Sequence, residues 1–548
     1  MRICRRASWA LAAGLLLAAG ITPMDAQQNP SSFPGADQEF QQGLLALKDG
    51  HFPAAVEHFT AAKRDHPNDP RIRNFFGIAL AALGRNSEAR AEYQEAIRLD
   101  PGMEDAYRNL GFLEWNRHHL QAAVKALTRA VALSARDAFA HYYLGRVYLD
   151  MQQYRPALEQ LEQSQAAWPE DAGFLIEAAQ GYAALGREQK ANALLHRAVQ
   201  FPLNDAQAAS AASLLLQIGD HASAISLLRR LADASSGGKG WARFDLALAE
   251  LTAGDYDQTA VDAQQYAGTV VADASGSSQL ASAWCLVGIA NARQARTEAA
   301  VNAFRKAAEL APAQEENWLN LTGELMEASR YAEAVAGVQQ GLASNPKSYA
   351  LHLRLGAALM AAGRYPEAEA VFRELVTAGD PLPTSYVGLA QVLLRLGRAQ
   401  EAVAELSAAR QKLGPNFLIS YFLGLSLEHA GKPSAALAAF QEAAQRNPAS
   451  AEAHIGIGKM ELASGHPKEA IPQLQQALRL DANNRQARRL LSAAYRRTGD
   501  TQNAAKYAQA GADGPEVSPR DLIGDFFLPK WQIPPAAARP SQPQSSRD

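Results

Sequence analysis

The stretch Trp284–Pro312, WCLVGIANARQARTEAAVNAFRKAAELAP, contains two apolar patterns of helical spacing separated by a short polar turn. In the first pattern Gly288 follows Trp284 by four residues, and in the second Phe304 follows Ala300 by four. Residues four apart lie on one face of an α-helix, so each pattern gives a helix with one packing face. The terminal proline cannot continue the second helix. The stretch therefore predicts one helix–turn–helix unit.

The same pattern recurs along the chain every 34 residues. In the first helices the recurring position is small: Gly43, Gly77, Gly111, Gly145 and Ala179, then Gly288, Thr322, Gly356, Ala390, Gly424, Gly458 and Ser492. In the second helices it is always alanine: Ala55, Ala89, Ala123, Ala157 and Ala191, then Ala300, Ala334, Ala368, Ala402, Ala436, Ala470 and Ala504. Small residues are required where two helices cross closely. A bulky residue follows most of these alanines by four positions, as Phe59 follows Ala55. We expect it to fill the space beside the small positions.

This repeat resembles the tetratricopeptide (TPR) repeat, a helix–turn–helix unit of about 34 residues. The resemblance covers about residues 36–511 and predicts an all-α solenoid, a right-handed superhelix of about fourteen units. Glycines at the ends of first helices, such as Gly50 and Gly363, support it, because helices commonly close with a left-handed residue. The resemblance implies a binding scaffold whose first helices line a concave groove.

The centre of the array is irregular. Between Gly186 and Ala295, which occupy the same turn position, lie 109 residues where three periods would give 102. Two degenerate units fit this interval, one with Gly219 and Ala224 and the other with Gly254, Tyr256 and Ala260. The extra residues are predicted to form loops at 235–238 and 268–278. These loops are either tolerated insertions or a hinge between two arms.

The first residues have the layout of a secretory signal peptide. Arg2, Arg5 and Arg6 precede an apolar run, Trp9 to Ile21, which is followed by the small residue Ala26. The run is too short to span a bilayer comfortably, although an uncleaved anchor is the alternative. We therefore expect an exported protein of bacterial type, periplasmic or extracellular, with no membrane span in the mature chain.

After Gly511 the repeat pattern stops. The apolar segment that follows is expected to fold back and cap the last unit, while a free partner-binding tag is the alternative. The predicted organisation is a signal peptide (1–26), a linker (27–35), a first TPR block (36–238), a degenerate unit with its loop (239–280), a second TPR block (281–512), a capping segment (513–533) and a disordered tail (534–548).

Composition and motifs argue against several functions. The net charge of −3 offers no basic excess for a phosphate backbone, so no nucleic-acid partner is expected. No phosphate loop, HExxH or GxSxG motif is present, so we predict no catalytic residues and no cofactor. The adjacent His118 and His119 do not share a helix face and read as a solvated turn rather than a metal site. Cys285 reads as a small buried or groove-facing residue rather than a nucleophile.

The third and fourth units carry the strongest candidate binding residues. Aromatic rings flanked by Arg and Asn would bury apolar side chains, hold a peptide backbone and take a carboxylate. The candidate groove residues are Asn74, Arg108, Asn109, Phe112, Trp115, Phe139, Tyr142 and Arg146. The alternative is that the rings only pad contacts between units. Asn109 and Asn320 are too few for the asparagine ladder of sugar-transferring TPR enzymes.

We therefore predict a non-catalytic scaffold that binds a protein or peptide partner, in an envelope or secretion assembly. An adaptor in polysaccharide synthesis or export is the first alternative. An enzyme with a site in the irregular centre is the second. The sequence does not predict the oligomeric state.

Overall fold

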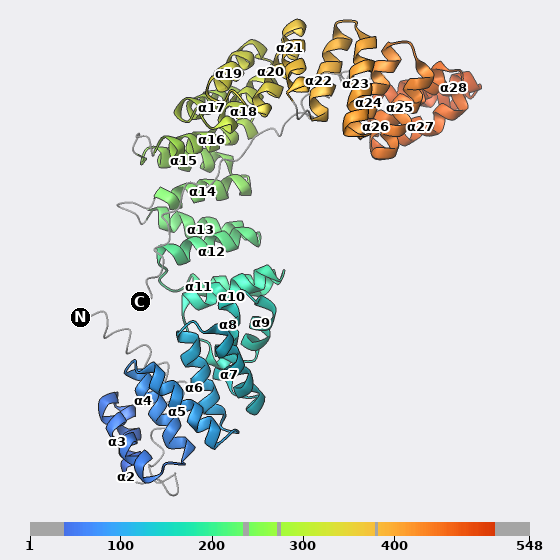
Figure 1. Ribbon diagram of the computed structural model, residues 1–548. Helices are drawn as coiled ribbons and strands as arrows, with labels where there is room; N and C mark the ends of the chain where they lie inside the picture. Colours follow the sequence, from blue (N-terminus) through green and yellow to red (C-terminus); the bar gives the residue numbers. More distant parts are fainter. Residues whose placement is uncertain (1–37, 234–239, 271–275, 379–381, 510–548) are drawn as a thin grey trace. The chain divides into compact units, whose positions relative to one another are not determined.

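The computed structural model describes residues 38–233, 240–270, 276–378 and 382–509. Within these ranges it contains 28 α-helices, one short 3₁₀-helix and no strand (Figure 1). The helices follow one another as fourteen pairs, which confirms the predicted all-α solenoid of about fourteen units. The chain forms two compact bodies, one ending at Leu228 and the other beginning at Arg229.

The first body contains eleven helices and the start of a twelfth. These are α2 (Gln38–Lys48), α3 (Phe52–Asp65), α4 (Pro70–Ala82), α5 (Asn86–Leu99), α6 (Glu104–Asn116), α7 (Leu120–Leu133), α8 (Ala138–Asp150), α9 (Tyr154–Glu162), α10 (Ala172–Ala184), α11 (Glu188–Ala198), α12 (Asp205–Gln217) and α13 (His221–Asp233), with the 3₁₀-helix η3 (Gln165–Ala167) after α9.

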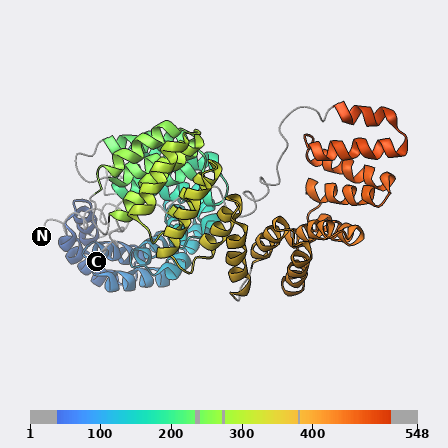
Figure 2. The same ribbon diagram turned by 90° about the horizontal axis from the view of Figure 1, so that it is seen from above.

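The second body contains the end of α13 and the remaining helices. These are α14 (Gly240–Ala253), α15 (Tyr256–Ala267), α16 (Ser277–Arg293), α17 (Thr297–Leu310), α18 (Glu315–Glu327), α19 (Tyr331–Ser344), α20 (Tyr349–Ala361), α21 (Tyr365–Thr377), α22 (Pro383–Arg395), α23 (Ala399–Leu413), α24 (Phe417–His429), α25 (Pro433–Arg446), α26 (Ala451–Ala463), α27 (Pro467–Leu480), α28 (Arg485–Thr498) and α29 (Thr501–Gln509). The last pairs, drawn orange to red, stack in chain order in both views (Figure 1 and Figure 2).

Glycines of the first helices lie directly against the bulky residues of the second. A Cβ added to Gly288 would stand 2.5 Å from two ring carbons of Phe304, and one added to Gly43 would stand 2.6 Å from Phe59. Real Cβ atoms do not approach other atoms so closely, so only glycine fits at this separation of the helices. The predicted reason for the 34-residue period is thereby confirmed in these pairs.

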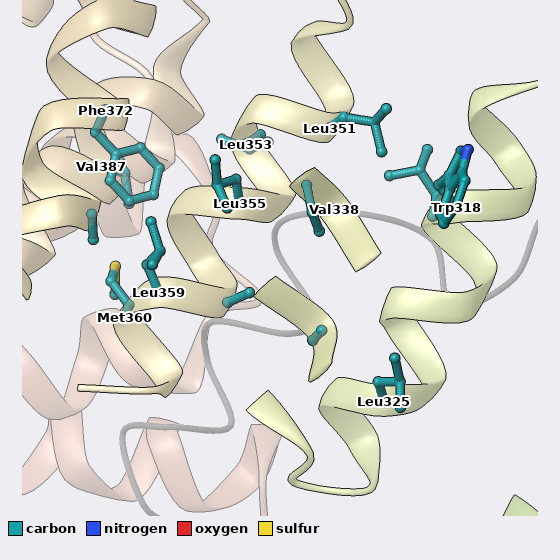
Figure 3. Close-up of a cluster of buried hydrophobic side chains, with 14 of the residues drawn as sticks. Trp318, Leu325, Val338, Leu351, Leu353, Leu355, Leu359, Met360, Phe372 and Val387 are labelled. Carbon is teal, nitrogen blue, oxygen red and sulfur yellow. The ribbon is translucent and has the colours of Figure 1, made fainter. Parts of the chain in front are cut away.

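Phe372 shows how the same contact joins neighbouring units. Its ring lies 2.5 Å from the Cβ position of Gly356 in its own unit and 2.3 Å from that of Gly388 in the next. The side chain is fully buried, beside Val387 in the core of the second body (Figure 3). Phe440 is held in the same way by Gly424 and Gly456. Each of these rings therefore belongs to the core of two units.

The turn between the two helices of a pair contains a left-handed residue in all fourteen described pairs. The predicted turn glycines have positive φ, for example +68° at Gly186 and +75° at Gly363. Four units place another residue at this position: His118, Gln152, Ala295 and Ser329, with φ between 55° and 58°. A side chain in this conformation is unfavourable. Ala295 therefore occupies the turn position that the 109-residue interval assigned to it.

The degenerate unit formed by α14 and α15 corrects one prediction. Its turn residue is Gly254, with φ of +84°. In regular units the small position comes five residues after the turn glycine, which here is Thr259. Thr259 is fully buried and its hydroxyl donates to the Asp255 carbonyl at 2.8 Å, whereas Ala260 is half-exposed. The prediction of Ala260 as the small buried residue of this unit was therefore wrong by one position, because Thr259 replaces the usual alanine.

First helices of successive pairs contact one another directly, as α4 with α6, α6 with α8 and α18 with α20. They therefore form a continuous layer within each body, as expected for repeats that curve with their first helices inward. Among the described helices, none is long and apolar enough to cross a bilayer. The signal peptide, the linker, the loop at 235–238, the capping segment and the tail all lie outside the described residues.

Candidate functional site

The candidate groove residues come from three consecutive first helices of the first body. Asn74 is on α4, Arg108 to Trp115 are on α6, and Phe139 to Arg146 are on α8. These helices contact one another in sequence, so the structure brings the eight residues onto one layer. Their exposure, however, divides them into two groups.

Four of the eight are buried and have partners within the chain. Asn74, Arg108, Asn109 and Phe112 are 2%, 6%, 0% and 7% exposed. The Asn109 amide donates to Asn74 Oδ1 at 3.0 Å, which ties α6 to α4. Side chains this deeply buried cannot contact a ligand without a rearrangement of the helices. Their role is structural: they hold the first helices that carry the exposed candidate residues in place.

Arg108 illustrates this supporting role. Its guanidinium donates to Asp137 Oδ2 at 2.5 Å and to Asp105. Asp137 is also the N-cap of α8, and its other oxygen accepts from the backbone N–H groups of Phe139 and Ala140 at 3.0 Å each. Burial lowers the pKa of Arg108, but the two carboxylates outweigh it and raise the pKa overall. The pair thus fixes the start of α8 against α6.

The other four residues, Trp115, Phe139, Tyr142 and Arg146, are partly exposed and lie around the buried ring of Tyr143. The Tyr143 centroid is 6.1 Å from that of Trp115, 6.5 Å from Phe139 and 5.5 Å from Tyr142. Tilted rings at these separations attract each other and stiffen the cluster. We call these four residues the aromatic surface.

Arg146 sits at the centre of the aromatic surface. Its guanidinium carbon lies 5.5 Å from the Trp115 centroid and 5.4 Å from that of Phe174 on α10. One nitrogen pairs with Glu177 at 2.9 Å and another donates to the Tyr142 hydroxyl at 3.3 Å. The Arg146 side chain is 17% exposed while that of Glu177 is 49% exposed. The cation is therefore anchored between rings, and its carboxylate partner is the more exposed member of the pair.

Sequence reasoning did not single out the central ring of Tyr143, and it missed three contributors from the next unit: Asp137, Phe174 and Glu177. Each belongs to a neighbouring first helix, and it meets its partner at a sequence separation of 28 to 31 residues. A separation slightly below one repeat is the signal that could have found them, because it marks contacts between adjacent units.

The side chains of Cys285 and His119, outside this surface, have partners within the chain. Cys285 is 1% exposed, and burial raises the pKa of its thiol to about 12, so the thiolate needed for nucleophilic chemistry is not formed. His119 pairs with Glu114 at 2.7 Å. In the described ranges no group of three His, Cys, Asp or Glu side chains could hold a metal ion.

The irregular centre contains buried charges. Glu250 of α14 is fully buried and pairs with Arg229 at 2.7 Å. Burial raises its pKa to about 7, while the hydrogen bond from Arg229 opposes the shift. Arg243 pairs with Asp262 at 2.8 Å. The Arg229–Glu250 pair joins α13 to α14, and the Arg243–Asp262 pair joins α14 to α15.

Beside them, α15, α16 and α17 enclose an open hollow of about 370 Å³. Trp284 lies on its wall with the Lys306 ammonium 4.0 Å from the ring centroid. Arg296 and Asp257 pair at its rim at 2.9 Å, with 52% and 68% of their side chains exposed. Exposed pairs of this kind contribute little energy.

Comparison with known proteins identifies the repeats. Sequence models of the family described as Tetratricopeptide repeat match residues 40–104, 324–383 and 387–451, residues 427–494, and residues 281–314. Similar proteins include the TPR repeat-containing protein PA4299 of Pseudomonas aeruginosa, 35% identical over 98 residues, which are 17% of this chain and 38% of that protein. The peroxisomal targeting signal receptor of Kluyveromyces lactis is 30% identical over 108 residues, 19% of each chain.

A third relative, the Hsp70-Hsp90 organizing protein of Triticum aestivum, is 26% identical over 90 residues, 16% of each chain. The chain spans less than two fifths of the length of each of these relatives.

Solved structures are similar at a lower level. The Cut9–Hcn1 tetramer of APC/C aligns at 14% identity and a TM-score of 0.34, over 85% of this chain and 98% of that one. MamA aligns at 25% identity and a TM-score of 0.27, over 30% of this chain and 88% of that one. Because the family models match them, residues 40–104, 281–314, 324–383, 387–451 and 427–494 are tetratricopeptide repeats.

Proposed function

We propose that this protein is a non-catalytic scaffold that binds an extended segment of a protein partner on the aromatic surface. The observation that carries the proposal is the position of Arg146, which is held between the Trp115 and Phe174 rings and paired with a half-exposed glutamate. Two of the relatives named above are, by their names, a receptor for a peroxisomal targeting signal and an organizing protein of Hsp70 and Hsp90.

The chemistry of the surface defines the segment it would accept. Partly exposed Trp115, Phe139 and Tyr142 offer apolar area and a rigid shape, which suit an apolar side chain of the partner. A carboxylate beside that side chain can replace Glu177 on Arg146, because the Glu177 side chain is half in solvent. The preferred ligand is therefore an apolar residue next to an acidic one.

The test uses a photo-crosslinking amino acid at position 115 in the native host, followed by mass spectrometry. Trp284, which is also half-buried but lies in the second body, provides the matched control position. We expect a partner that crosslinks from position 115 and not from position 284. Purified Trp115→Ala should then bind this partner at least tenfold more weakly than Trp284→Ala. Equal crosslinking from both positions, or equal affinity of both variants, would refute the proposal.

Arg108 is unsuitable for this test. Its removal would leave the buried Asp137 carboxylate without its cation and would loosen the start of α8. Loss of binding in such a variant would report on folding rather than on contact.

We further propose that the protein is exported and works in an envelope or secretion assembly. The support is the arginine-rich start, the apolar run and the small residue at Ala26. N-terminal sequencing of the native protein should begin near Gln27, whereas an intact Met1 would contradict processing. Periplasmic partners recovered by pull-down decide between this assembly and a role in polysaccharide export.

A further inference from the structure

The first helices of the second body, which form its inner layer, include an arginine, Arg354, that forms no ion pair among the described residues. Arg354 on α20 extends toward α18, where its guanidinium approaches only the sulfur of Met326, at 3.9 Å. Its Nε is buried and has no hydrogen-bond partner. Among the described residues no carboxylate lies within ion-pairing distance of it. The residue as a whole is partly exposed, so the buried Nε is the group that lacks a partner and requires an explanation.

The same sequence position in other units has an internal partner. Asn320, 34 residues earlier, donates to the Cys285 sulfur at 3.1 Å on the preceding first helix. Asn109 of the first body donates to Asn74 in the same manner. Both of these partners lie 35 residues before the asparagine. The residue 35 positions before Arg354 is the apolar Leu319, so no polar group at that position receives the guanidinium. The long side chain passes between α18 and α20 and ends beside Met326.

Two other arginines of the first helices, in contrast, have carboxylate partners within the chain. Arg108 pairs with Asp105 and Asp137, and Arg146 pairs with Glu177. Burial opposes the charge of both, yet the neighbouring carboxylates raise both pKa values. For Arg354 burial dominates and lowers the pKa to about 10, with only a longer-range attraction from Glu327. Arg354 therefore has a weaker electrostatic compensation than either of them.

We propose that Arg354 is a carboxylate-binding position on the inner layer of the second body, which takes an acidic side chain of a bound protein segment. A guanidinium presents paired N–H donors that match a planar carboxylate. The Met326 thioether beside it accommodates the apolar stem of such a residue. The charge of Glu327 nearby opposes a doubly charged phosphate more than a single carboxylate. This site is separate from the aromatic surface. Because that surface would also accept an apolar residue next to an acidic one, the peptide titrations below compare proteins that all carry Trp115→Ala.

The first arm of the test asks whether Arg354 is unpaired in the free protein. Arg354→Met keeps the length of the side chain and removes the charge, and Arg146→Met is the matched control at a paired arginine. We expect Arg354→Met to leave the thermal unfolding midpoint unchanged or raised, and Arg146→Met to lower it. A comparable decrease in both variants would show that Arg354 has an internal partner and would overturn the proposal.

The second arm measures the ligand. The probes are the peptide acetyl-Ala-Leu-Glu-Leu-Ala-amide, its Gln counterpart and inorganic phosphate, each titrated to millimolar concentration by calorimetry at constant ionic strength. We expect the Glu peptide to bind Trp115→Ala at least tenfold more tightly than it binds the Trp115→Ala, Arg354→Met double variant, and more tightly than the Gln peptide does. Phosphate binding without Glu-peptide binding would overturn the choice of carboxylate. Equal binding of the Glu peptide to the single and double variants, or no binding, would overturn the site.

Discussion

The contact between Gly388 and Phe372 allows a quantitative test of how neighbouring units are joined. In Gly388→Ala the new methyl group would stand 2.3 Å from one Phe372 ring carbon and 2.6 Å from another. Overpacking of a filled core typically costs about 1–3 kcal/mol, while replacing a helical glycine by alanine returns about 1 kcal/mol. We therefore expect the free energy of unfolding to fall by up to about 2 kcal/mol.

Gly181 provides the matched control. It also lies inside a first helix, α10, but its added Cβ would meet its nearest atoms at 3.4 and 3.5 Å, which is ordinary contact. Gly181→Ala should therefore gain about 0.5–1 kcal/mol from helix propensity alone. The two variants carry the same chemical change and should move in opposite directions.

Urea unfolding followed by circular dichroism measures both variants, and hydrogen exchange across α21 and α22 locates the effect. In a Phe372→Ala background the clash disappears, so Gly388→Ala should become stabilising there. A decrease of the same size in both backgrounds would refute the packing argument, since it would show that the ring is not what the methyl group meets.

Three further predictions follow from single residues. Ala295→Gly should stabilise the protein by about 0.5–1 kcal/mol in the same urea assay, because it removes a left-handed alanine at a small entropic cost. Gly363→Ala at the equivalent turn should instead destabilise it. Tyr93→Phe should raise the thermal unfolding midpoint, because the buried Tyr93 hydroxyl has no hydrogen-bond partner. A lowered midpoint would reveal a hidden partner. The pKa of Glu250 is raised in the folded chain, to about 7, so its contribution to stability is complete below about pH 4.5 and is lost as the pH rises through 7. The stability of wild type relative to Glu250→Gln should therefore fall by up to about 3 kcal/mol between pH 4.5 and pH 8. A constant difference would contradict the raised pKa.

The repeat itself could be predicted from sequence because its cause is local. The small and bulky positions lie within one unit, and their spacing follows from helix geometry. Thr259 escaped this reasoning because the pattern required alanine, while the buried position also accepts a threonine that bonds to its own helix.

The candidate site could be predicted only in part. The repeat period predicts which residues lie on the first helices, so Trp115 and Arg146 could be predicted as candidate binding residues. Burial depends on what the neighbouring unit presents, as Asp137 does for Arg108 and Asn74 for Asn109. Such contacts join residues about one repeat apart. The pattern within one unit does not predict which residue the neighbouring unit places against it.

The shared rings also decide where the chain can be divided. Phe372 belongs to α21, yet one of its faces is covered by Gly388 of α22. A fragment that ends at the close of α21, as the sequence repeat suggests, would leave this face of the ring in water. A fragment that continues through α22 to Arg395 would keep it covered. Soluble shorter arrays of this protein should therefore contain an odd number of helices, ending on a first helix rather than on a completed repeat.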